Sequence, residues 1–172
     1  MKKNHLLCFF LLAFFGSQAV FAQSPEEKLK QMGIELPEVS QPMANYVKWK
    51  QVGNLLFLAG NGPDMFGKVG ADLTPEQGYE AARLTGLEII AVLKAATGDL
   101  SRIKQFVKVL GMVNSTPDFT GHPKVINGFS DLMVEVFGEK GKHARSAVGV
   151  AALPNNIAVE IEVIVELEDE KL

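Results

Sequence analysis

Cysteine and histidine are scarce in this chain of 172 residues. Its single cysteine, Cys8, lies in an N-terminal segment that we expect to be removed, so the mature protein would hold no thiol, no disulfide and no cysteine-based metal site. Of its three histidines, only His122 and His143 lie beyond that segment, and they are not spaced as a pair of ligands on one helix face. The sequence therefore predicts no metal site.

An excess of positive charge is also lacking. The chain has 17 lysine and arginine residues against 20 aspartate and glutamate residues. Loss of Lys2 and Lys3 with the N-terminal segment would leave 15 basic residues against 20 acidic ones, a net charge of −5. An acidic chain has no overall field that attracts nucleic acid. We therefore expect no nucleic-acid partner.

Signatures of common cofactor and nucleophile chemistry are missing as well. The glycine-rich stretch 60–63 lacks the Lys-Ser/Thr of a phosphate-binding loop and the glycine spacing of a dinucleotide fingerprint. Ser146 has no obvious histidine and aspartate partners in the order that serine hydrolases use. The sequence predicts no cofactor and disfavours a serine hydrolase.

The first 22 residues read as a secretory signal peptide. Lys2 and Lys3 precede an apolar run over residues 6–15, and small residues stand at Ala19-Val20-Phe21-Ala22 before a cleavage point. The run is shorter than the roughly 18–20 residues that a membrane-spanning helix needs, which disfavours an uncleaved anchor. We expect cleavage after Ala22, a secreted or periplasmic protein, and no membrane association after cleavage.

Removal of 22 residues from 172 leaves 150, a length that suits one domain with a real core. Residues 23–44 are predicted to form an N-terminal extension. Its short helix would begin with Ser24 as N-cap, Pro25 in the first helical position and Glu27 completing a capping box. Residues 45–172 are predicted to form the domain itself.

The domain reads as strands and helices in the order β-β-α-β-α-β-β. Two strands joined at Gly53-Asn54 are followed by a helix that starts at the capping box over 74–77 and stops near Gly98. A strand over 102–113, a helix over 122–141 and two strands within 143–167 complete the order. This order predicts an α+β fold with both helices on one face of a single sheet, the other face being solvated or covered by another subunit.

The stretch "HARSAVGVAALPNNIAVEIEVIVEL", residues 143–167, places charges on its two strands. Arg145 is either a surface residue paired with an acid or a guanidinium fork for a carboxylate or phosphate. Glu160 is either one of several exposed acids or a carboxylate that orients or deprotonates water. The turn "LPNN" predicts a hairpin, and strand alternation makes the two residues candidates for one face.

Three further features of the sequence are relevant to packing or to a site. The small residues Ala147 and Gly149, on the same strand face as Arg145, hint at close packing of another subunit. Tyr46 at a strand start is either half buried for packing or part of a site. Asn127 is unfavourable in a helix and so indicates a specific reason for its presence.

Four motifs carry a resemblance to the RidA/YjgF family: "ANYV", "LLFLAGNGP", "GDLSRIKQFVKVLGMVNS" and the stretch over 143–167. The resemblance covers about residues 43–168. The blocks over 67–87 and 122–154 are similar to the branch called YjgF/chorismate mutase-like, or putative endoribonuclease. The resemblance implies a chorismate mutase-like fold and a homotrimer with a barrel-like core of sheets, helices outside and ligands in clefts between neighbouring subunits.

The resemblance also implies an activity. RidA members hydrolyse reactive enamines and imines of 2-oxo acids and release ammonia, which predicts a small carboxylate-bearing substrate. Arg145 matches the residue that grips the substrate carboxylate, and Glu160 matches the residue that positions the attacking water. Tyr46, Asn127 and Gly60 match further residues of the cleft. Such chemistry needs neither a metal nor a covalent nucleophile.

The chain departs from the family pattern at two positions. Ala59 replaces a serine beside the cleft loop, and Ala147 replaces a cysteine whose main contribution is its backbone N–H, which alanine also has. The main prediction is an imine deaminase. The alternatives are a non-enzymatic binder of carboxylate metabolites in the same cleft and, third, the endoribonuclease of the branch label, which the net charge disfavours.

Overall fold

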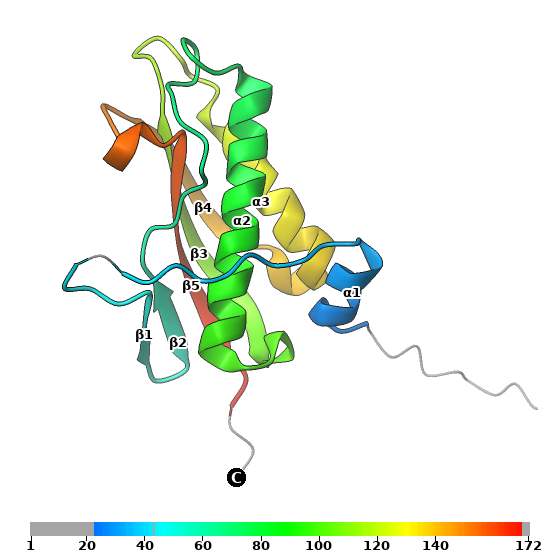
Figure 1. Cartoon of the computed structure of the whole chain (residues 1–172). Coiled ribbons are helices and arrows are strands. Elements are labelled where there is room, and N and C mark those ends of the chain that lie inside the picture. Colours follow the sequence, from blue (N-terminus) through cyan, green and yellow to red (C-terminus); the bar gives the residue numbers. More distant parts are fainter. Residues whose placement is uncertain (1–22, 43, 170–172) are drawn as a thin grey trace, which may run out of the picture.

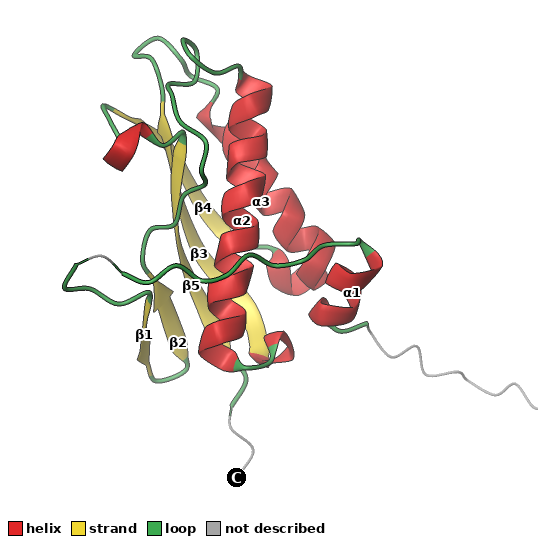
Figure 2. Ribbon diagram, viewed as in Figure 1, coloured by secondary structure: helices red, strands yellow, loops and turns green. Residues whose placement is uncertain are grey.

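The computed structural model describes residues 23–42 and 44–169; the predicted signal peptide lies outside this part of the chain. Within it, one five-stranded sheet has two long helices against one face, and a third, short helix lies beside them (Figures 1 and 2). The elements are α1 (Pro25–Gln31), β1 (Trp49–Val52), β2 (Leu55–Leu58), α2 (Pro75–Thr97), β3 (Ile103–Asn114), α3 (His122–Phe137), β4 (Ala144–Val150) and β5 (Val159–Leu167). The predicted α+β class and element order are confirmed.

Residues 23–42, most of the predicted N-terminal extension, are tied to the rest of the chain through helix α1. Ser24 Oγ accepts from the backbone N–H of Glu27 while the Glu27 carboxylate accepts from the Ser24 N–H, so the predicted capping box is present. Glu26 Oε1 accepts from Lys94 Nζ at 2.6 Å and from the Leu100 N–H at 2.7 Å. These contacts fix α1 near the end of α2, and the chain then crosses the outer side of α2 toward β1 (Figure 1).

Helix α2 starts and stops where the sequence predicts. Thr74 caps it through Gln77, and Gly98 ends it with a left-handed φ of 72°, which glycine adopts at low cost. Helix α3 packs against it closely, because a side chain at Gly128 would overlap the backbone carbonyl of Tyr79. The two helices thus form one layer over the sheet.

The sheet has the strand order β1-β2-β5-β3-β4, in which β3 and β4 are parallel and the other pairs are antiparallel. The alternation predicted for β5 is confirmed: the buried side chains face the helices, namely Val159, Ile161, Val163, Val165 and Leu167. The opposite, open face carries apolar side chains as well, among them Met112 and Val148, the latter 42% exposed. None of the described helices is long and apolar enough to cross a membrane.

The predicted hairpin between the last two strands is wrong. Strand β3 lies between β4 and β5 and pairs with both. Residues of "LPNN" form a short 3₁₀ turn, Pro154–Asn156, held by Asn114, whose Nδ2 donates to Asn156 Oδ1 and to the Ile157 carbonyl. The reason is the crossover: β3, α3 and β4 form a parallel unit that places β4 outside β3, so β5 must return on the other side of β3.

The prediction that Arg145 and Glu160 share one face is wrong for the same reason. Arg145 is in register with Val109, whose side chain faces the helices, and Glu160 is in register with Met112 on the open face. Side chains alternate along each strand as expected. Which residues of two different strands share a face depends on how the strands pair, and the sequence did not reveal the pairing. The two charged residues therefore point to opposite sides of the sheet.

The small residues of β4 also serve a different packing role from the one predicted. A side chain at Gly149 would overlap the imidazole of His122, the first residue of α3, and partly buried Ala147 packs against the core on the same strand face. On the neighbouring strand, a Cβ at Gly111 would lie 2.6 Å from Ile126 Cγ1. The small face makes room for α3 rather than for another subunit.

Candidate functional site

The guanidinium of Arg145 lies between the edge strand β4 and α3. Its Nη1 donates to Asn127 Oδ1 at 3.0 Å and to Ser130 Oγ at 2.8 Å, and its Nη2 donates to the Pro123 carbonyl at 3.3 Å. The Nε–H and one Nη2–H have no acceptor among the described residues. Both donors belong to one planar guanidinium, a group that can bind a carboxylate in two-point fashion.

Two residues that the sequence reasoning did not select lie behind Arg145. Ser130 Oγ is 3.0 Å from His143 Nε2, and His143 Nδ1 is 2.7 Å from the Gly141 carbonyl. Burial lowers the pKa of His143, and the positive charge of Arg145 lowers that pKa further. The hydrogen bond to the Gly141 carbonyl acts in the opposite direction, but the pKa of His143 remains lowered, which favours a neutral imidazole behind the guanidinium at neutral pH. The sequence did contain a sign that Ser130 belongs to this group: it lies three residues after Asn127 on a predicted helix, so the two side chains share a face.

A hollow of about 490 Å³ opens at this place. Its lining consists of Asn127, Ser130, Val134, Lys142, His143 and Arg145. The structure thus brings together two of the predicted residues, Arg145 and Asn127. The predicted Ala147 follows Arg145 by two positions on the same strand face. We refer to this group as the arginine half-site.

Glu160 lies on the open face of β5 beside the loop that follows β2. A side chain at Gly60 would overlap the Glu160 carboxylate, so the bare backbone at position 60 makes the space that this carboxylate fills. The backbone of the next residue, Asn61, exchanges two hydrogen bonds with Ile161, which holds the loop against β5. The structure therefore brings the predicted residues Gly60 and Glu160 together, and we refer to them as the glutamate half-site.

The carboxylate of Glu160 is held in an unusual setting. It is only partly exposed, and no hydrogen bond or ion pair to it occurs within residues 23–42 and 44–169. Burial raises its pKa, and the negative charge of Glu162 raises that pKa further. A carboxylate without a partner and with raised proton affinity is suited to accept a proton from water.

Tyr46 lies apart from both half-sites, whereas Ala59 directly precedes Gly60 of the glutamate half-site. Tyr46 precedes β1, at the sheet edge opposite to β4, and is 49% exposed. In the described part of the chain, no hydrogen bond joins it to Arg145 or Glu160. The backbone N–H of Ala59 donates to the Lys48 carbonyl, and the Ala59 carbonyl accepts from Asn61 Nδ2.

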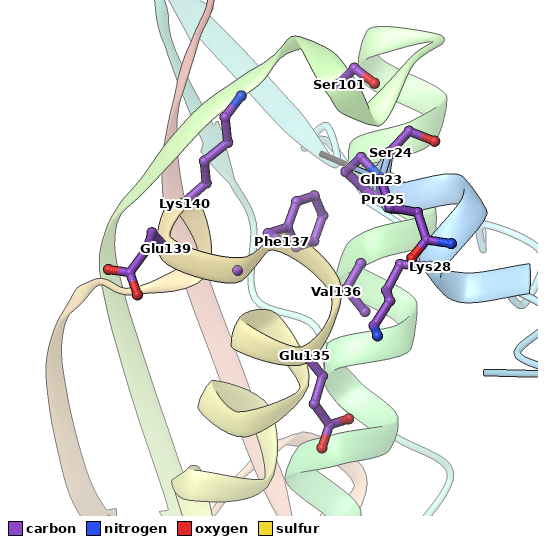
Figure 3. A pocket seen from close by; sticks show the side chains of 11 residues that line it. Gln23, Ser24, Pro25, Lys28, Ser101, Glu135, Val136, Phe137, Glu139 and Lys140 are labelled. Carbon is purple, nitrogen blue, oxygen red and sulfur yellow. The ribbon is translucent and has the colours of Figure 1, made fainter. Parts of the chain in front are cut away.

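A second hollow, of about 570 Å³, lies between α1 and the end of α3 (Figure 3). Gln23, Ser24 and Lys28 line it from the side of α1, and Phe137 and Lys140 line it from the other side. Its charged groups are of both signs, and none of the predicted site residues contributes to it. Across the described residues there is also no group of three or more His, Cys, Asp or Glu side chains that could hold a metal ion.

Comparison with known proteins decides the family. A model of the YjgF/chorismate mutase-like, putative endoribonuclease family matches residues 26–167. The chain belongs to this family. The resemblance seen in the motifs, and the chorismate mutase-like fold that it implies, are thereby confirmed.

Individual relatives of this YjgF-family chain carry different names. Protein TCP17 of Trypanosoma cruzi is 45% identical over 148 residues, which cover 82% of this chain and 92% of that protein. A 2-iminobutanoate/2-iminopropanoate deaminase of Dermatophagoides farinae is 31% identical over 140 residues, which cover 78% of this chain and 95% of that protein. The crystal structure of a putative endoribonuclease from Shewanella oneidensis MR-1 is 39% identical, with a TM-score of 0.82, and covers 84% of this chain and 100% of that one.

Proposed function

We propose that the protein hydrolyses 2-imino acids, and the enamines that interconvert with them, to 2-oxo acids and ammonia. The observation that carries this proposal is the presence of two complementary groups: among the described residues, Arg145 keeps uncommitted donors and Glu160 has no partner. The first suits the carboxylate of such a substrate, and the second suits the water that must attack it. The deaminase name of the relative from Dermatophagoides farinae supports the same reaction.

The chemistry follows from the charges. In a protonated 2-imino acid the imine carbon is electrophilic, so water can attack it once Glu160 accepts a proton from that water. A C–O bond forms, giving a carbinolamine, and Glu160 then passes the proton to the nitrogen. The C–N bond breaks with its electron pair going to nitrogen, the carbonyl forms, and the hydroxyl proton passes to the departing ammonia. The net change adds one water to the protonated imine and releases one ammonium ion, and the glutamate ends as it began.

A complete site requires a second copy of the chain. Within one copy, Arg145 and Glu160 point to opposite faces. They are two strand spacings of about 4.8 Å apart across the sheet, and their partners on β3, Val109 and Met112, are three residues apart along the strand. The carboxylate and the imine carbon of the substrate are adjacent atoms, so one copy cannot offer both residues to one molecule. We therefore propose that the arginine half-site of one copy meets the glutamate half-site of the next.

A closed ring of three copies fits this arrangement, as the family resemblance implies. Strands β1 and β4 are the two edges of the sheet, so the segment with Tyr46 on one copy can reach the neighbour's β4. The partly exposed apolar side chains of the open face, such as Met112 and Val148, would then be covered. Mass measurement in solution tests this homotrimer.

The decisive experiment measures ammonia release from freshly generated 2-iminobutanoate. We expect the wild-type protein to accelerate release, and Arg145→Ala and Glu160→Gln to abolish the acceleration. Glu162→Gln is the matched control, because Glu162 is an exposed acid two residues along the same strand face. Wild-type release no faster than that of Arg145→Ala would overturn the proposal.

Non-enzymatic binding is the second candidate, favoured by Ala59 and Ala147, which stand where the family pattern has a serine and a cysteine. It predicts thermal stabilisation by 2-oxobutanoate that is lost in Arg145→Ala and is not accompanied by turnover. Cleavage of RNA by nuclease-free protein, abolished by a mutation of either half-site, would instead support the endoribonuclease name. The excess of acidic residues argues against that outcome.

A further inference from the structure

We propose that Ser130 and His143 are positioning residues, which hold the guanidinium of Arg145 in the plane that receives the substrate carboxylate. This inference rests on the proposed role of Arg145. The three side chains form one continuous line of hydrogen bonds from β4 through α3 to the residues before β4. The family resemblance gave a role to Arg145 but none to Ser130 or His143.

The Gly141 carbonyl, at the end of this line away from Arg145, determines which atom donates and which accepts in each hydrogen bond. The Gly141 carbonyl can only accept, so His143 Nδ1 carries the proton at that contact, 2.7 Å long. In a neutral imidazole the other nitrogen, Nε2, must then accept, and it accepts from Ser130 Oγ–H at 3.0 Å. The lone pairs of Ser130 Oγ are thereby turned toward Arg145 Nη1, 2.8 Å away.

The surroundings keep His143 in this state. Its ring packs against Phe129, with ring centroids 5.7 Å apart, and against Phe106, with centroids 6.4 Å apart. On the side of His143 Nε2, the charged group is the guanidinium of Arg145, which lies beyond Ser130. The neighbouring cation, Lys142, is paired with Glu139 at 2.7 Å. Apolar rings and a nearby guanidinium both favour the neutral imidazole over the imidazolium.

The line determines which donors of Arg145 remain for a ligand. Both Nη1 protons are used, one by Asn127 and one by Ser130, and these two bonds fix the plane and rotation of the guanidinium. Without Ser130, only Asn127 and the longer bond from Nη2 to the Pro123 carbonyl would hold the guanidinium, and it could turn more freely. The Nε–H and Nη2–H would then face the ligand only part of the time, which weakens two-point binding.

The test combines equilibrium binding of 2-oxobutanoate with steady-state kinetics on 2-iminobutanoate. In Ser130→Ala we expect the Kd and KM to rise about tenfold, while kcat stays within about threefold because the glutamate half-site is untouched. Ser130→Thr keeps the hydroxyl and should return both constants to within about threefold of wild type. His143→Phe, which removes the acceptor behind Ser130, should raise them in the same direction.

The chain offers a matched control in a second Ser–His pair. Ser115 Oγ lies 3.2 Å from Nε2 of His122, the first residue of α3, and neither side chain is among the hydrogen-bond partners of Arg145. Ser115→Ala should therefore leave the Kd within about twofold. In nitrogen NMR, 2-oxobutanoate should shift the Nε2 resonance of His143 but leave that of His122 in place, a readout that purely structural packing would not produce.

The outcomes separate this inference from the proposed function. Loss of binding in Arg145→Ala with an unchanged Kd in Ser130→Ala would overturn the positioning role alone. A Kd in Ser130→Thr no better than in Ser130→Ala would also overturn it, because the hydroxyl would then not be the group that matters. Unchanged binding in Arg145→Ala would instead refute the role of Arg145 itself, and with it the proposed function.

Discussion

Replacement of Glu160 by glutamine should stabilise the unliganded protein at neutral and alkaline pH while it removes activity. The carboxylate is partly buried beside Gly60, has no partner among the described residues, and lies near Glu162, so its charge is unfavourable in the folded state. Glutamine has nearly the same shape without the charge. The residue that suits catalysis is thus expected to weaken the fold.

The magnitude follows from burial and screening. A fully buried, unpaired carboxylate would be far more costly, but Glu160 retains some exposure, and we therefore expect a gain on the order of 1 kcal/mol in the free energy of unfolding. For a domain of this size, that corresponds to a rise of roughly 2–4 °C in Tm. Loss of a group that accepts a proton from water should lower kcat by about 10²-fold or more.

The gain in stability should depend on pH in one direction. Because the folded-state pKa of Glu160 is raised above its ordinary value of 4.5, its contribution to stability is fully present below about pH 4.5 and is lost as the pH rises through the folded-state pKa. The gain from glutamine should therefore be seen at pH 8 and vanish near pH 4. Thermal unfolding of wild type and Glu160→Gln at both pH values measures it, and Glu162→Gln, which removes only the repulsion between the two carboxylates, should give a smaller gain. A lower Tm for Glu160→Gln at pH 8, or an equal gain at pH 4, would refute the reasoning.

Three further predictions concern Gly60, Gly128 and His143. Gly60→Ala places a methyl group where the Glu160 carboxylate lies, and should lower kcat about tenfold or more with little change in the secondary structure seen by circular dichroism. Gly128→Ala forces α3 away from the Tyr79 carbonyl and should cost roughly 2–4 kcal/mol, measured by urea unfolding; a loss below about 0.5 kcal/mol would contradict the close contact. The folded-state pKa of His143 is lowered by burial, so the unfolded chain binds its proton first as the pH falls below 6.5, and stability should decline from there toward the folded-state pKa. Urea unfolding between pH 8 and 5 should show this decline in wild type, and a slope that is as steep in His143→Phe would exclude His143 as its source.

Local chemistry accounts for most of what could be predicted of the fold. The capping boxes at Ser24 and Thr74 and the left-handed turn at Gly53 are decided by side chains within a few residues of each other, and all three are present in the structure. Alternation along β5 is equally local, because successive side chains of a strand must point to opposite faces. The family motif likewise marks Arg145 and Glu160 as residues of interest from the sequence alone.

Local sequence patterns could not predict how the strands pair. Adjacent strands joined by a turn usually form a hairpin, but here β3 takes the place between β4 and β5 because α3 carries the chain across in a parallel crossover. This strand order places Arg145 and Glu160 on opposite faces of the sheet instead of on the one face that the sequence predicted. It also changed the meaning of Ala147 and Gly149, which accommodate α3.

By itself, then, the sequence determined the elements, their caps, their apolar faces and the family, because each depends on contacts between residues close along the chain or on a motif read directly. Only the tertiary structure decided that Arg145 lies with Ser130 and His143 on the helix side of an edge strand, and that Glu160 lies beside Gly60 on the open face. These are contacts between residues distant in sequence, and their geometry depends on the order in which the strands join the sheet.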